Sequence, residues 1–306
     1  MSGNLLIIGG SGFVSGTLAR RAMSAGWRVW VVTRGQRPLP DRVTAIVADR
    51  KETTAFDNGI ASAMESARID RFDLVAECIG YDPQDAAQDV AVLRDRARQL
   101  LFVSTDFVFD PAHRTFPQGE SSEHYLSDGY GGKKRLCEQE LMNADCGDMA
   151  WTVVRPCHIY GPGSLLGCLP EHGRDKGLLQ RLRDGQALRL VGGGHFLQQP
   201  ILARDLADLI LGVAGRADLH GRIFQAAGPD IVESVIYYRI IADILGVDLQ
   251  VEEVPVDAFL AENPGAAPFL CHRIYDLSAL REAGLPVPAT PLTTGLVEQV
   301  AAIEAM

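Results

Sequence analysis

The sequence predicts an α/β protein, with a doubly wound parallel sheet in the first half followed by a smaller C-terminal α/β domain. Three observations support this fold class. Apolar runs of strand length alternate with helical stretches up to about residue 156, a glycine-rich turn joins the first run to the first helix, and the alternation changes beyond that point. Because crossovers between parallel strands are right-handed, helices should cover both faces of the sheet.

The first half contains short apolar runs that we expect to be buried strands. They are Leu5–Ile8, Arg28–Val32, Val43–Val47, Leu74–Cys78, Leu100–Ser104 and Trp151–Val154. The helical stretches between them are Phe13–Ala25, a weaker segment at 59–67, Pro83–Gln99 and Tyr130–Met142. Gly26 follows the first helix, and a glycine in that place commonly ends a helix.

Beyond residue 156 a segment rich in glycine and proline, YGPGSLLGCLPEHG, precedes further elements. The expected helices are Lys176–Arg183, Arg204–Val213, Glu233–Leu245, Ser278–Ala283 and Thr293–Ile303, and the expected strands are Leu188–Val191, RIFQAAG at 222–228 and Leu249–Val254. We expect one domain from residues 1–156 with a segment returning near 199–228, and a second from 157–198 with 229–306. The second domain would face the carboxyl ends of the parallel strands, where such sheets bind ligands.

Composition argues against several functional classes. The chain has 306 residues, 47% of them hydrophobic, and a formal net charge of -10, without the basic face of a nucleic-acid-binding protein. No apolar run approaches the ~18 residues of a membrane span, and no basic segment precedes the first strand as in a signal peptide. The six cysteines form neither a C-x-x-C pair nor a cluster with zinc spacing, so we expect no metal site and a reduced, cytoplasmic protein.

The first expected strand leads into GGSGFVSGT at residues 9–17. Dinucleotide-binding loops have a third glycine at the position that Ser15 occupies in this chain. Here the nearest glycine is one residue later, at Gly16. Amides at the start of the following helix can hold a pyrophosphate, so this order of strand, loop and helix predicts a Rossmann-type cofactor site; the alternative is a purely structural turn. We expect Ser15 to face the first strand. The expected cofactor contacts are Gly9, Gly10, Ser11, Gly12, Phe13 and Val14.

The end of the second strand indicates which cofactor is preferred. NAD-binding folds of this type carry an acidic residue there for the ribose hydroxyl, whereas this chain has Thr33 followed by Arg34. A carboxylate would repel a 2′-phosphate and a guanidinium would bind one, so NADP is favoured over NAD, unless Arg34 is an ordinary surface arginine. Asp49 and Arg50 end the third strand and would also line the cofactor, although Asp49 could equally cap the next segment.

Ser104 and Thr105 end the fifth strand, and Tyr130 and Lys134 stand four residues apart on a predicted helix. This spacing places both side chains on one helix face. A tyrosine acting as a base near pH 7 needs its pKa lowered by about three units, or roughly 4 kcal/mol. A lysine cation about 4 Å away supplies roughly that much at an effective dielectric near 20. The pattern predicts proton transfer by Tyr130 at an alcohol or ketone oxygen that Thr105 holds.

With these residues in view, the chain resembles the extended short-chain dehydrogenase/reductases, the NAD(P)-dependent epimerase/dehydratase family. The resemblance rests on IIGGSGFVSG, STDFVFD, the Tyr130/Lys134 pair and RPCHIYGPG, and it covers nearly the whole chain. It implies that Thr105, Tyr130 and Lys134 are the catalytic triad and that a homodimer forms through the helices at 83–99 and 130–142. The further cofactor contacts that it implies are Cys78, Ile79, Gly80, Ser104, Tyr130, Lys134 and Pro156.

The segment STDFVFD is most similar to that of the dTDP-4-dehydrorhamnose reductases, while the opening segment is also similar to the branch that contains chloroplast stem-loop-binding proteins. Sugar-nucleotide dehydratases carry an acid where this chain has Phe107, so dehydration is not expected. The resemblance implies hydride transfer between nicotinamide and a sugar-like alcohol or ketone, with a nucleotide sugar as the expected substrate. The alternatives are reduction of a non-sugar ketone and a cofactor-bound, RNA-associated or regulatory role.

Two expected substrate contacts depart from the pattern of the sugar epimerases. These enzymes have an asparagine where this chain has His158, and a clamping arginine where it has Gln198. A nucleotide sugar would lose an arginine contact to its phosphates unless Arg183, Arg204 or Arg273 replaces it. The expected substrate contacts are Tyr81, Asp106, Phe107, His158 and Gln198.

Overall fold

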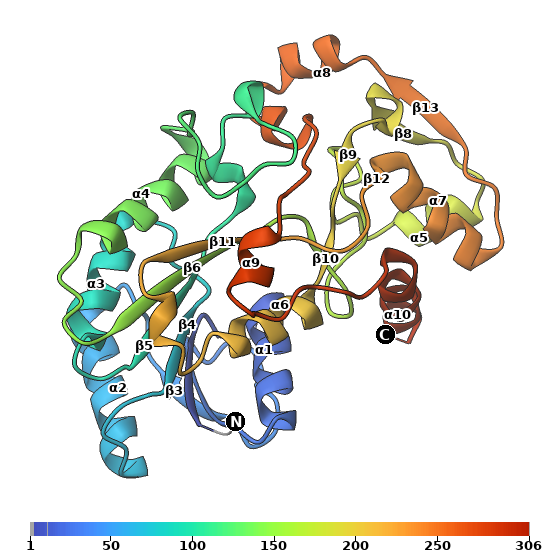
Figure 1. Cartoon of the computed structure of the whole chain (residues 1–306). Helices are drawn as coiled ribbons and strands as arrows, with labels where there is room; N and C mark the ends of the chain where they lie inside the picture. Colours follow the sequence, from blue (N-terminus) through green and yellow to red (C-terminus); the bar gives the residue numbers. More distant parts are fainter. Residues whose placement is uncertain (1–2, 11, 306) are drawn as a thin grey trace.

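The computed structural model describes residues 3–10 and 12–305, and it contains a parallel sheet of seven strands (Figure 1). In chain order these are β1 (Asn4–Ile8), β2 (Arg28–Thr33), β3 (Thr44–Val47), β4 (Leu74–Glu77), β5 (Gln99–Val103), β6 (Ala150–Pro156) and β11 (Arg222–Ala226). Their order across the sheet is β11-β6-β5-β4-β1-β2-β3. The order reverses between β1 and β4, the place where open α/β sheets bind ligands. The predicted doubly wound, Rossmann-type fold is confirmed.

Helices cover both faces of the sheet, as right-handed crossovers require. On one face lie α1 (Phe13–Ser24) and α6 (Ala203–Gly212), and on the other lie α2 (Thr53–Ala67), α3 (Pro83–Leu93) and α4 (Gly129–Asn143) (Figure 1). Strand β1 shows how the sequence produces two cores. Leu5 and Ile7 pack in the cluster with α1 and α6, whereas Leu6 and Ile8 pack in the cluster with the other three helices. Because both faces are buried, the strand is a continuous apolar run.

The C-terminal region contains three two-stranded sheets. They pair β7 (Ile159–Tyr160) with β10 (Ile201–Leu202), β9 (Leu197–Gln198) with β12 (Val232–Glu233), and β8 (Leu188–Val191) with β13 (Val251–Val254). Its helices are α5 (Leu178–Arg183), α7 (Ser234–Leu245), α8 (Val256–Glu262), α9 (Ser278–Glu282) and α10 (Leu292–Glu304). Short 3-10 helices are η1 (Asp106–Val108), η2 (Pro111–His113), η3 (Gly192–Gly194), η4 (Ala217–Leu219) and η5 (Pro264–Phe269).

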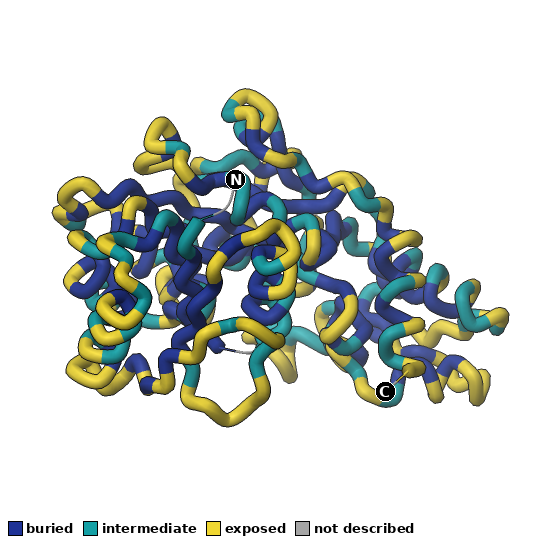
Figure 2. The backbone as a smooth tube through the Cα atoms, turned by 90° about the horizontal axis from the view of Figure 1, so that it is seen from below, coloured by how far each residue is buried: buried dark blue, intermediate teal, exposed yellow. Residues whose placement is uncertain are grey.

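A third apolar cluster, which includes Leu190, Tyr238 and Leu296, joins most of the C-terminal elements. By contrast, α6 and β11 pack with the large sheet although they lie late in the chain. This distribution supports the expected two domains, and we propose boundaries near residues 157, 198 and 229. Figure 2 shows the buried backbone running through the interior and the exposed loops around its outline.

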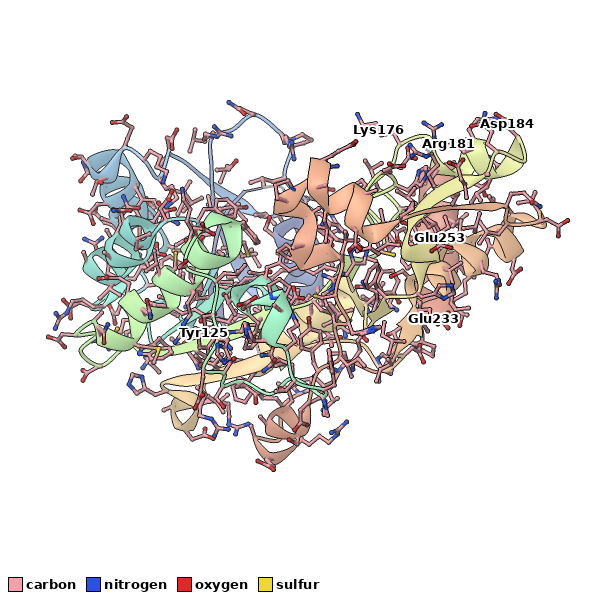
Figure 3. All side chains as sticks on the ribbon, turned by 90° about the horizontal axis from the view of Figure 1, so that it is seen from above. Tyr125, Lys176, Arg181, Asp184, Glu233 and Glu253 are labelled. Carbon is pink, nitrogen blue, oxygen red and sulfur yellow. The ribbon has the colours of Figure 1, made fainter. Side chains whose placement is uncertain are left out.

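The outer surface of α5 carries charged side chains that point away from the protein, including Arg181 and Asp184 (Figure 3). Arg181 Nε lies 3.2 Å from Asp175, and Arg183 pairs with Glu304. These arginines therefore form a solvated helix face with acidic neighbours and not a basic patch. None of the helices in the described part of the chain combines the length and apolar character that a membrane span requires.

Two helix boundaries differ by more than two residues from the sequence prediction. Helix α3 ends at Leu93, well before Gln99, because the next turn leads into β5 and is held by backbone hydrogen bonds from Phe72 to Arg96 (2.8 Å) and from Arg98 back to Phe72 (2.9 Å). Helix α2 is longer than the expected 59–67, because its buried stripe begins at Phe56.

Candidate active site

The turn after β1 requires glycine at two consecutive positions. Gly9 and Gly10 have φ of +133° and +64°, and both amides donate to the carbonyl of Val32. A Cβ at Gly9 would lie 2.9 Å from Ile79, and one at Gly10 would lie 3.2 Å from the Thr33 hydroxyl. The chain therefore passes close to the ends of β2 and β4 before it enters α1. The next expected contact, Ser11, lies outside the described residues.

Ser15 occupies the place of the third glycine, as expected. Its hydroxyl accepts a hydrogen bond from the Gly12 amide (3.0 Å) and donates to the carbonyl of Gly9 (3.3 Å), so it faces the loop at the end of β1. A Cβ on Gly16 would meet only the guanidinium of Arg20, at 3.5 Å. The serine thus ties the loop to the first turn of α1, and Gly16 has no comparable role.

A cavity of about 510 Å³ follows this loop along the ends of β1, β2 and β3. Thr33 ends β2, and its hydroxyl accepts from the Gly35 amide (3.2 Å). Asp49 accepts from the Lys51 amide (3.0 Å), so it caps the following turn while it also lines the cavity. The expected cofactor residues that line this cavity are Gly9, Gly10, Gly12, Thr33, Arg34, Asp49, Arg50 and Ile79, and Arg37, Lys51 and Tyr81 join them.

The sequence suggested that Arg50 contacts the cofactor, but its guanidinium instead bonds to acidic residues of the protein. Its side chain is almost fully buried, and its guanidinium donates to Glu77 (2.5 Å), to Asp89 (2.9 Å) and to the carbonyl of Asp85 (2.7 Å). Its charge is therefore engaged by the acids of β4 and α3. A buried arginine needs such partners, and no local sequence pattern indicates that these acids meet it there.

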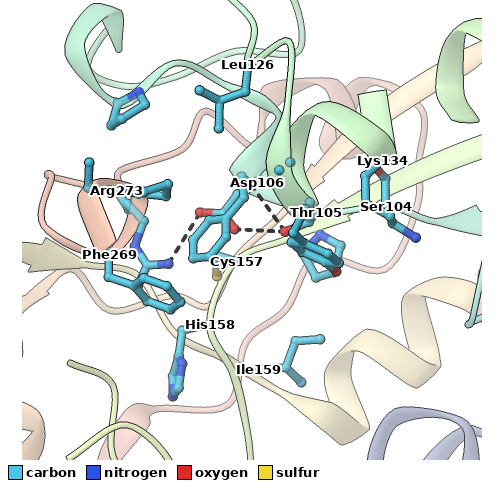
Figure 4. Close-up of a pocket in the computed structure, with 18 of the residues that line it drawn as sticks. Ser104, Thr105, Asp106, Leu126, Lys134, Cys157, His158, Ile159, Phe269 and Arg273 are labelled. Carbon is cyan, nitrogen blue, oxygen red and sulfur yellow. Dashed lines mark hydrogen bonds and ion pairs between the residues drawn. The ribbon is translucent and has the colours of Figure 1, made fainter. Parts of the chain in front are cut away.

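A second cavity, of about 750 Å³, collects the predicted catalytic residues (Figure 4). Thr105, Tyr130 and Lys134 all line it. The other expected residues in its wall are Val14, Cys78, Tyr81, Ser104, Asp106, Phe107, Pro156 and His158. Two expected cofactor residues line neither cavity: Phe13 lies near Gly163, and Gly80 packs against Phe102.

Tyr130 reaches Thr105 because α4 lies unusually close to η1. A Cβ at Gly131 would lie 1.8 Å from the carbonyl oxygen of Phe107, and one at Gly132 would lie 2.5 Å from Ser127. Only glycine allows this approach. These two glycines had no assigned role in the sequence, although their position directly after Tyr130 was the available signal.

Thr105 lies two residues after β5 and caps η1. Its hydroxyl accepts from the Phe107 amide (3.2 Å) and donates to the Asp106 carboxylate (3.4 Å). Ser104 points to α4 instead. Its hydroxyl donates to Glu138 (2.6 Å), and Arg155 donates two hydrogen bonds to the same carboxylate. Ser104 therefore braces α4 against the sheet, while Thr105 remains at the cavity.

Lys134 is almost fully buried, and its ammonium donates to the carbonyls of Gly80 (2.8 Å) and Val103 (2.6 Å). Its charge also lies 4.2 Å from the ring centroid of Phe102. Burial lowers the pKa of this lysine. The lysine thereby ties α4 to the ends of β4 and β5, in addition to any contact with a ligand.

The pKa of Tyr130 corrects the expectation from the sequence. Although half of the side chain is exposed in the cavity, burial of the hydroxyl raises its pKa to about 12, and Tyr81 and Asp106 add to the rise. Contacts with Thr105 and Arg174 act in the other direction but are weaker. Lys134, which the sequence suggested would lower this pKa, is not among the leading influences, and its ammonium donates to two carbonyls. The phenol is therefore protonated at neutral pH.

Asp106 forms the centre of a buried charged group in the cavity wall. Arg114 and Arg273 each approach its carboxylate to 3.6 Å, and the Tyr275 hydroxyl donates to it. The sequence singled out Asp106 but missed Arg114, which follows it in an irregular loop, and Tyr275, which lies far from it along the chain. No short-range pattern links such residues.

Gln198 does not contact the cavity, contrary to expectation. It is almost fully buried, and its amide oxygen accepts a hydrogen bond from Arg273. Of the three arginines considered as replacements for the missing clamp, Arg273 alone lines the cavity, since Arg183 pairs with Glu304 and Arg204 with Glu298 (2.9 Å).

His158 lies where the catalytic cavity meets a neighbouring cavity of about 660 Å³. Burial, together with the charges of Arg273 and Arg174, lowers its pKa to about 3, so the imidazole is neutral at physiological pH. Arg174 and Phe269 also line both cavities. The space is therefore long enough for a ligand that extends well beyond the reacting group. No cluster of metal-ligating side chains occurs among the described residues.

Comparisons with known proteins agree with this geometry. A model of the NAD dependent epimerase/dehydratase family matches residues 5–227. The dTDP-4-keto-6-deoxy-D-glucose reductase of Streptomyces niveus is 30% identical over 169 residues, which cover 53% of this chain and 54% of that protein. The chloroplast stem-loop binding protein of 41 kDa b of Arabidopsis thaliana is 23% identical over 246 residues, which cover 74% of this chain and 59% of that protein. The chain thus spans little more than half the length of these relatives.

Solved structures share the fold over nearly the whole chain. The UDP-glucose 4-epimerase of Thermotoga maritima, solved with UDP-glucose, is 17% identical with a TM-score of 0.75, and the match covers 99% of both chains. The Bordetella bronchiseptica enzyme WbmF, solved with NAD+, is 17% identical with a TM-score of 0.71, and the match covers 99% of this chain and 93% of that one.

Proposed function

Since the chain belongs to the NAD dependent epimerase/dehydratase family, we propose that it is an NAD(P)-dependent oxidoreductase or epimerase that acts on an alcohol or ketone carbon of a nucleotide sugar. The observation that carries this proposal is the meeting of Thr105, Tyr130 and Lys134 with Arg273 in one cavity. The first three residues serve proton transfer at a substrate oxygen, and the arginine suits an anionic group nearby.

The residues around the 510 Å³ cavity fit a dinucleotide. Gly9 and Gly10 leave space that a Cβ would fill, and the amides at the start of α1 suit a pyrophosphate. When bound, NAD(P) supplies the hydride donor or acceptor. We favour NADP, because β2 ends in Thr33 where a carboxylate would repel a 2′-phosphate, and because Arg34 and Arg37 line the same cavity.

Tyr130 acts as the acid in the reductive direction. Its raised pKa keeps the phenol protonated, so it can give a proton to a carbonyl oxygen that the Thr105 hydroxyl orients. In the oxidative direction the same oxygen would lose its proton to a tyrosinate, which is scarce at neutral pH when the pKa is about 12. The protonated phenol therefore suits the reductive direction.

A nucleotide sugar suits the cationic part of the cavity. The buried pair Arg114 and Arg273 faces the single carboxylate of Asp106, which leaves an excess of positive charge, and Arg174 adds another guanidinium. A buried excess charge is stabilised by an anionic ligand such as a diphosphate. The names of the Streptomyces niveus reductase and the Thermotoga maritima epimerase point to the same substrate class.

The deciding experiment is turnover with a panel of dTDP- and UDP-linked sugars and 4-keto sugars, with NADP(H) and NAD(H), followed by nicotinamide absorbance. Tyr130→Phe should lower kcat by about 100- to 10,000-fold. The exposed neighbour Lys133 supplies a matched control, since Lys133→Ala should change kcat by less than about twofold. The wild-type rate of ketone reduction should stay level through neutral pH and fall only at alkaline pH, as Tyr130 ionises. Full turnover by Tyr130→Phe would refute the proposed chemistry.

A second candidate is the reduction of a non-sugar ketone. It is favoured by the apolar surface beside Tyr130, where Phe107 lies with its ring 6.4 Å from that of Tyr130 and 4.8 Å from that of Phe269. Thermal-shift measurements with UDP and dTDP separate the two candidates. A nucleotide-sugar enzyme should be stabilised by one of these nucleotides, and a non-sugar reductase should respond only to the cofactor.

We also propose that the protein is a cytoplasmic homodimer. Leu136 and Met142 of α4 are exposed at 44% and 50%, on the helix that family resemblance assigns to a dimer interface. The cysteines are all free, which suits a reducing compartment. Light scattering after gel filtration should give twice the chain mass, and a monomer at micromolar concentration would contradict the dimer.

A further inference from the structure

The Asp106 carboxylate lies between the catalytic Thr105 and a segment that arrives from the C-terminal end of the chain. Asp106 is 2% exposed, and its side chain accepts the hydrogen bond from the Thr105 hydroxyl (Figure 4). Burying a carboxylate is costly unless donors surround it. The identity of those donors therefore determines where Asp106, and with it Thr105, comes to rest.

Two residues form a dedicated holder for this carboxylate. The Tyr275 hydroxyl donates to Asp106 Oδ2, and Arg114 donates to that hydroxyl (2.9 Å) and to the backbone carbonyl of Asp106 (2.8 Å). Arg114 thus fixes the orientation of the tyrosine hydroxyl, which leaves its proton directed at the carboxylate. Such coupled hydrogen bonds strengthen one another in a buried site.

Arg273 is not needed as part of the holder. Its guanidinium stays 3.6 Å from the Asp106 carboxylate, while its hydrogen bond goes to Gln198. Its Nε has no hydrogen-bond partner among the described residues. Arg273 lines the cavity, where it can meet a substrate, whereas Tyr275 with Arg114 keeps Asp106 in place.

The backbone around Tyr275 is pinned on both sides. Its amide donates to the side chain of Gln199 (2.8 Å). The residues on either side of Tyr275 bond to the backbone of Gln118. The backbone amide of Gln118 donates to the carbonyl of Ile274 (2.7 Å), and its carbonyl accepts from the amide of Asp276 (3.0 Å). The tyrosine is 4% exposed. The hydroxyl therefore has a single available position.

We propose that Tyr275 is a positioning residue for the reaction: by holding Asp106 through its hydroxyl, it keeps the Thr105 side chain in one rotamer beside Tyr130 and the substrate oxygen. A threonine hydroxyl can occupy three rotamers, and Asp106 together with the Phe107 amide selects one of them. The inference rests on the proposed function, since it concerns the alignment of the same catalytic group.

The test is a double-mutant cycle of Tyr275→Phe and Asp106→Asn, with the substrate that the wild type turns over in the sugar panel. Tyr275→Phe should lower kcat by about 10- to 100-fold, the cost of a misaligned catalytic group. KM and the Kd for NADP should change by less than about threefold. The double variant should be no slower than Asp106→Asn alone, because the tyrosine acts through that carboxylate.

The pH profile separates positioning from a general structural effect. The titratable, charged or hydroxyl groups around Tyr130 include Tyr81, Asp106, Thr105, Arg174 and Lys134, and the carboxylates of Asp110 and Asp128 line the same cavity. The charge of Asp106 raises the pKa of Tyr130, so Asp106→Asn should move the alkaline limb of kcat to lower pH. Tyr275→Phe leaves the charge in place and should leave the limb where it is.

Tyr125→Phe is the matched control, since that hydroxyl bonds to the loop backbone at Ser122 and Glu120 and does not line the cavity, so kcat should not change. If Tyr275→Phe does not fold, Arg114→Gln removes the other half of the holder and should give the same loss. Unchanged kcat, or losses that multiply in the double variant, would overturn the inference. Full turnover by Tyr130→Phe would instead refute the proposed function.

Discussion

The two walls of the candidate active site are built in different ways. The cofactor wall, made by Gly9, Gly10, Thr33 and Ile79, consists of backbone turns at the ends of neighbouring strands. The substrate wall, which contains Asp106, Arg174 and Arg273, consists of side chains that meet from distant segments. Tyr275, which holds Asp106 from behind, lies 169 residues away from it along the chain. A wall of backbone can be inferred from local sequence, whereas a wall of side chains depends on the whole fold.

The walls also differ in what stabilises them. The cofactor wall depends on space, because two glycines leave room that any side chain would fill. The substrate wall depends on charge, since its buried arginines and carboxylate are stable only together. Substitutions should therefore affect one wall at a time, and the following variants test that separation.

Gly131→Ala should have the largest effect, and on the substrate wall. Its Cβ would lie 1.8 Å from the carbonyl oxygen of Phe107, so α4 must shift and carry Tyr130 with it. We expect kcat to fall by at least about 100-fold, and the free energy of unfolding to fall by about 1–3 kcal/mol. Turnover and thermal unfolding measure both. Gly119→Ala is the control, because a Cβ there meets nothing within 4 Å. An equal loss of NADP binding would show that the walls are not separable.

Arg273→Met should mainly weaken substrate binding. It removes a buried guanidinium from the cavity, so we expect KM for the nucleotide sugar to rise about 10- to 100-fold while the Kd for NADP stays within about twofold. Steady-state kinetics and a cofactor titration measure the two effects. Arg183→Met, which breaks only the surface pair with Glu304, should change neither. An unchanged KM for Arg273→Met would remove the arginine from the proposed substrate site.

Arg34→Ala should affect the cofactor wall alone. If its guanidinium binds a 2′-phosphate, the ratio of the Kd values for NAD and NADP should fall by about tenfold, while substrate KM remains the same. Fluorescence titrations with both cofactors test this, with Arg20→Ala on α1 as the control. A constant ratio would mean that Arg34 is an ordinary surface arginine.

The pair Ser15→Ala and Gly16→Ala should give the smallest effects, with opposite signs. Loss of the Ser15 hydroxyl leaves the Gly12 amide without its partner and should cost about 1 kcal/mol. Alanine at Gly16 meets only Arg20 and favours helix, so it should stabilise by about 0.5–1 kcal/mol. Denaturant unfolding of both variants checks the register of the loop. Destabilisation by Gly16→Ala larger than that by Ser15→Ala would reverse the assignment.

Much of the fold could be predicted because short segments carry their own signals. The parallel sheet follows from apolar runs such as Leu5–Ile8, which must be buried on both faces, and the first helix follows from the glycine turn before it. The position of β11 beside β6 could not be predicted, since the segment RIFQAAG indicates a strand but not the strand with which it pairs. Likewise the sequence predicted α3 too long, because hydrogen bonds from Phe72 decide where its last turn stops.

The candidate catalytic residues could also be predicted from short segments, but the pKa of Tyr130 could not. Tyr130 and Lys134 share a helix face by spacing alone, and Thr105 follows a buried strand. The pKa of Tyr130 depends on how deeply its hydroxyl is buried and on Tyr81 and Asp106, which belong to other segments. Its direction was therefore opposite to the one that the Tyr–Lys spacing suggested.

The sequence by itself determined the parallel sheet, the glycine-rich loop with Ser15 in place of the third glycine, and the candidate catalytic residues just after β5 and near the start of α4. These follow from backbone geometry and from hydrophobic periodicity, both of which act over a few residues. Only the tertiary structure decided that Arg50 and Gln198 are buried against other side chains, that Arg273 enters the cavity, and that Tyr275 holds Asp106. Burial and charge depend on every atom nearby, and in a folded chain those atoms come from anywhere in the sequence.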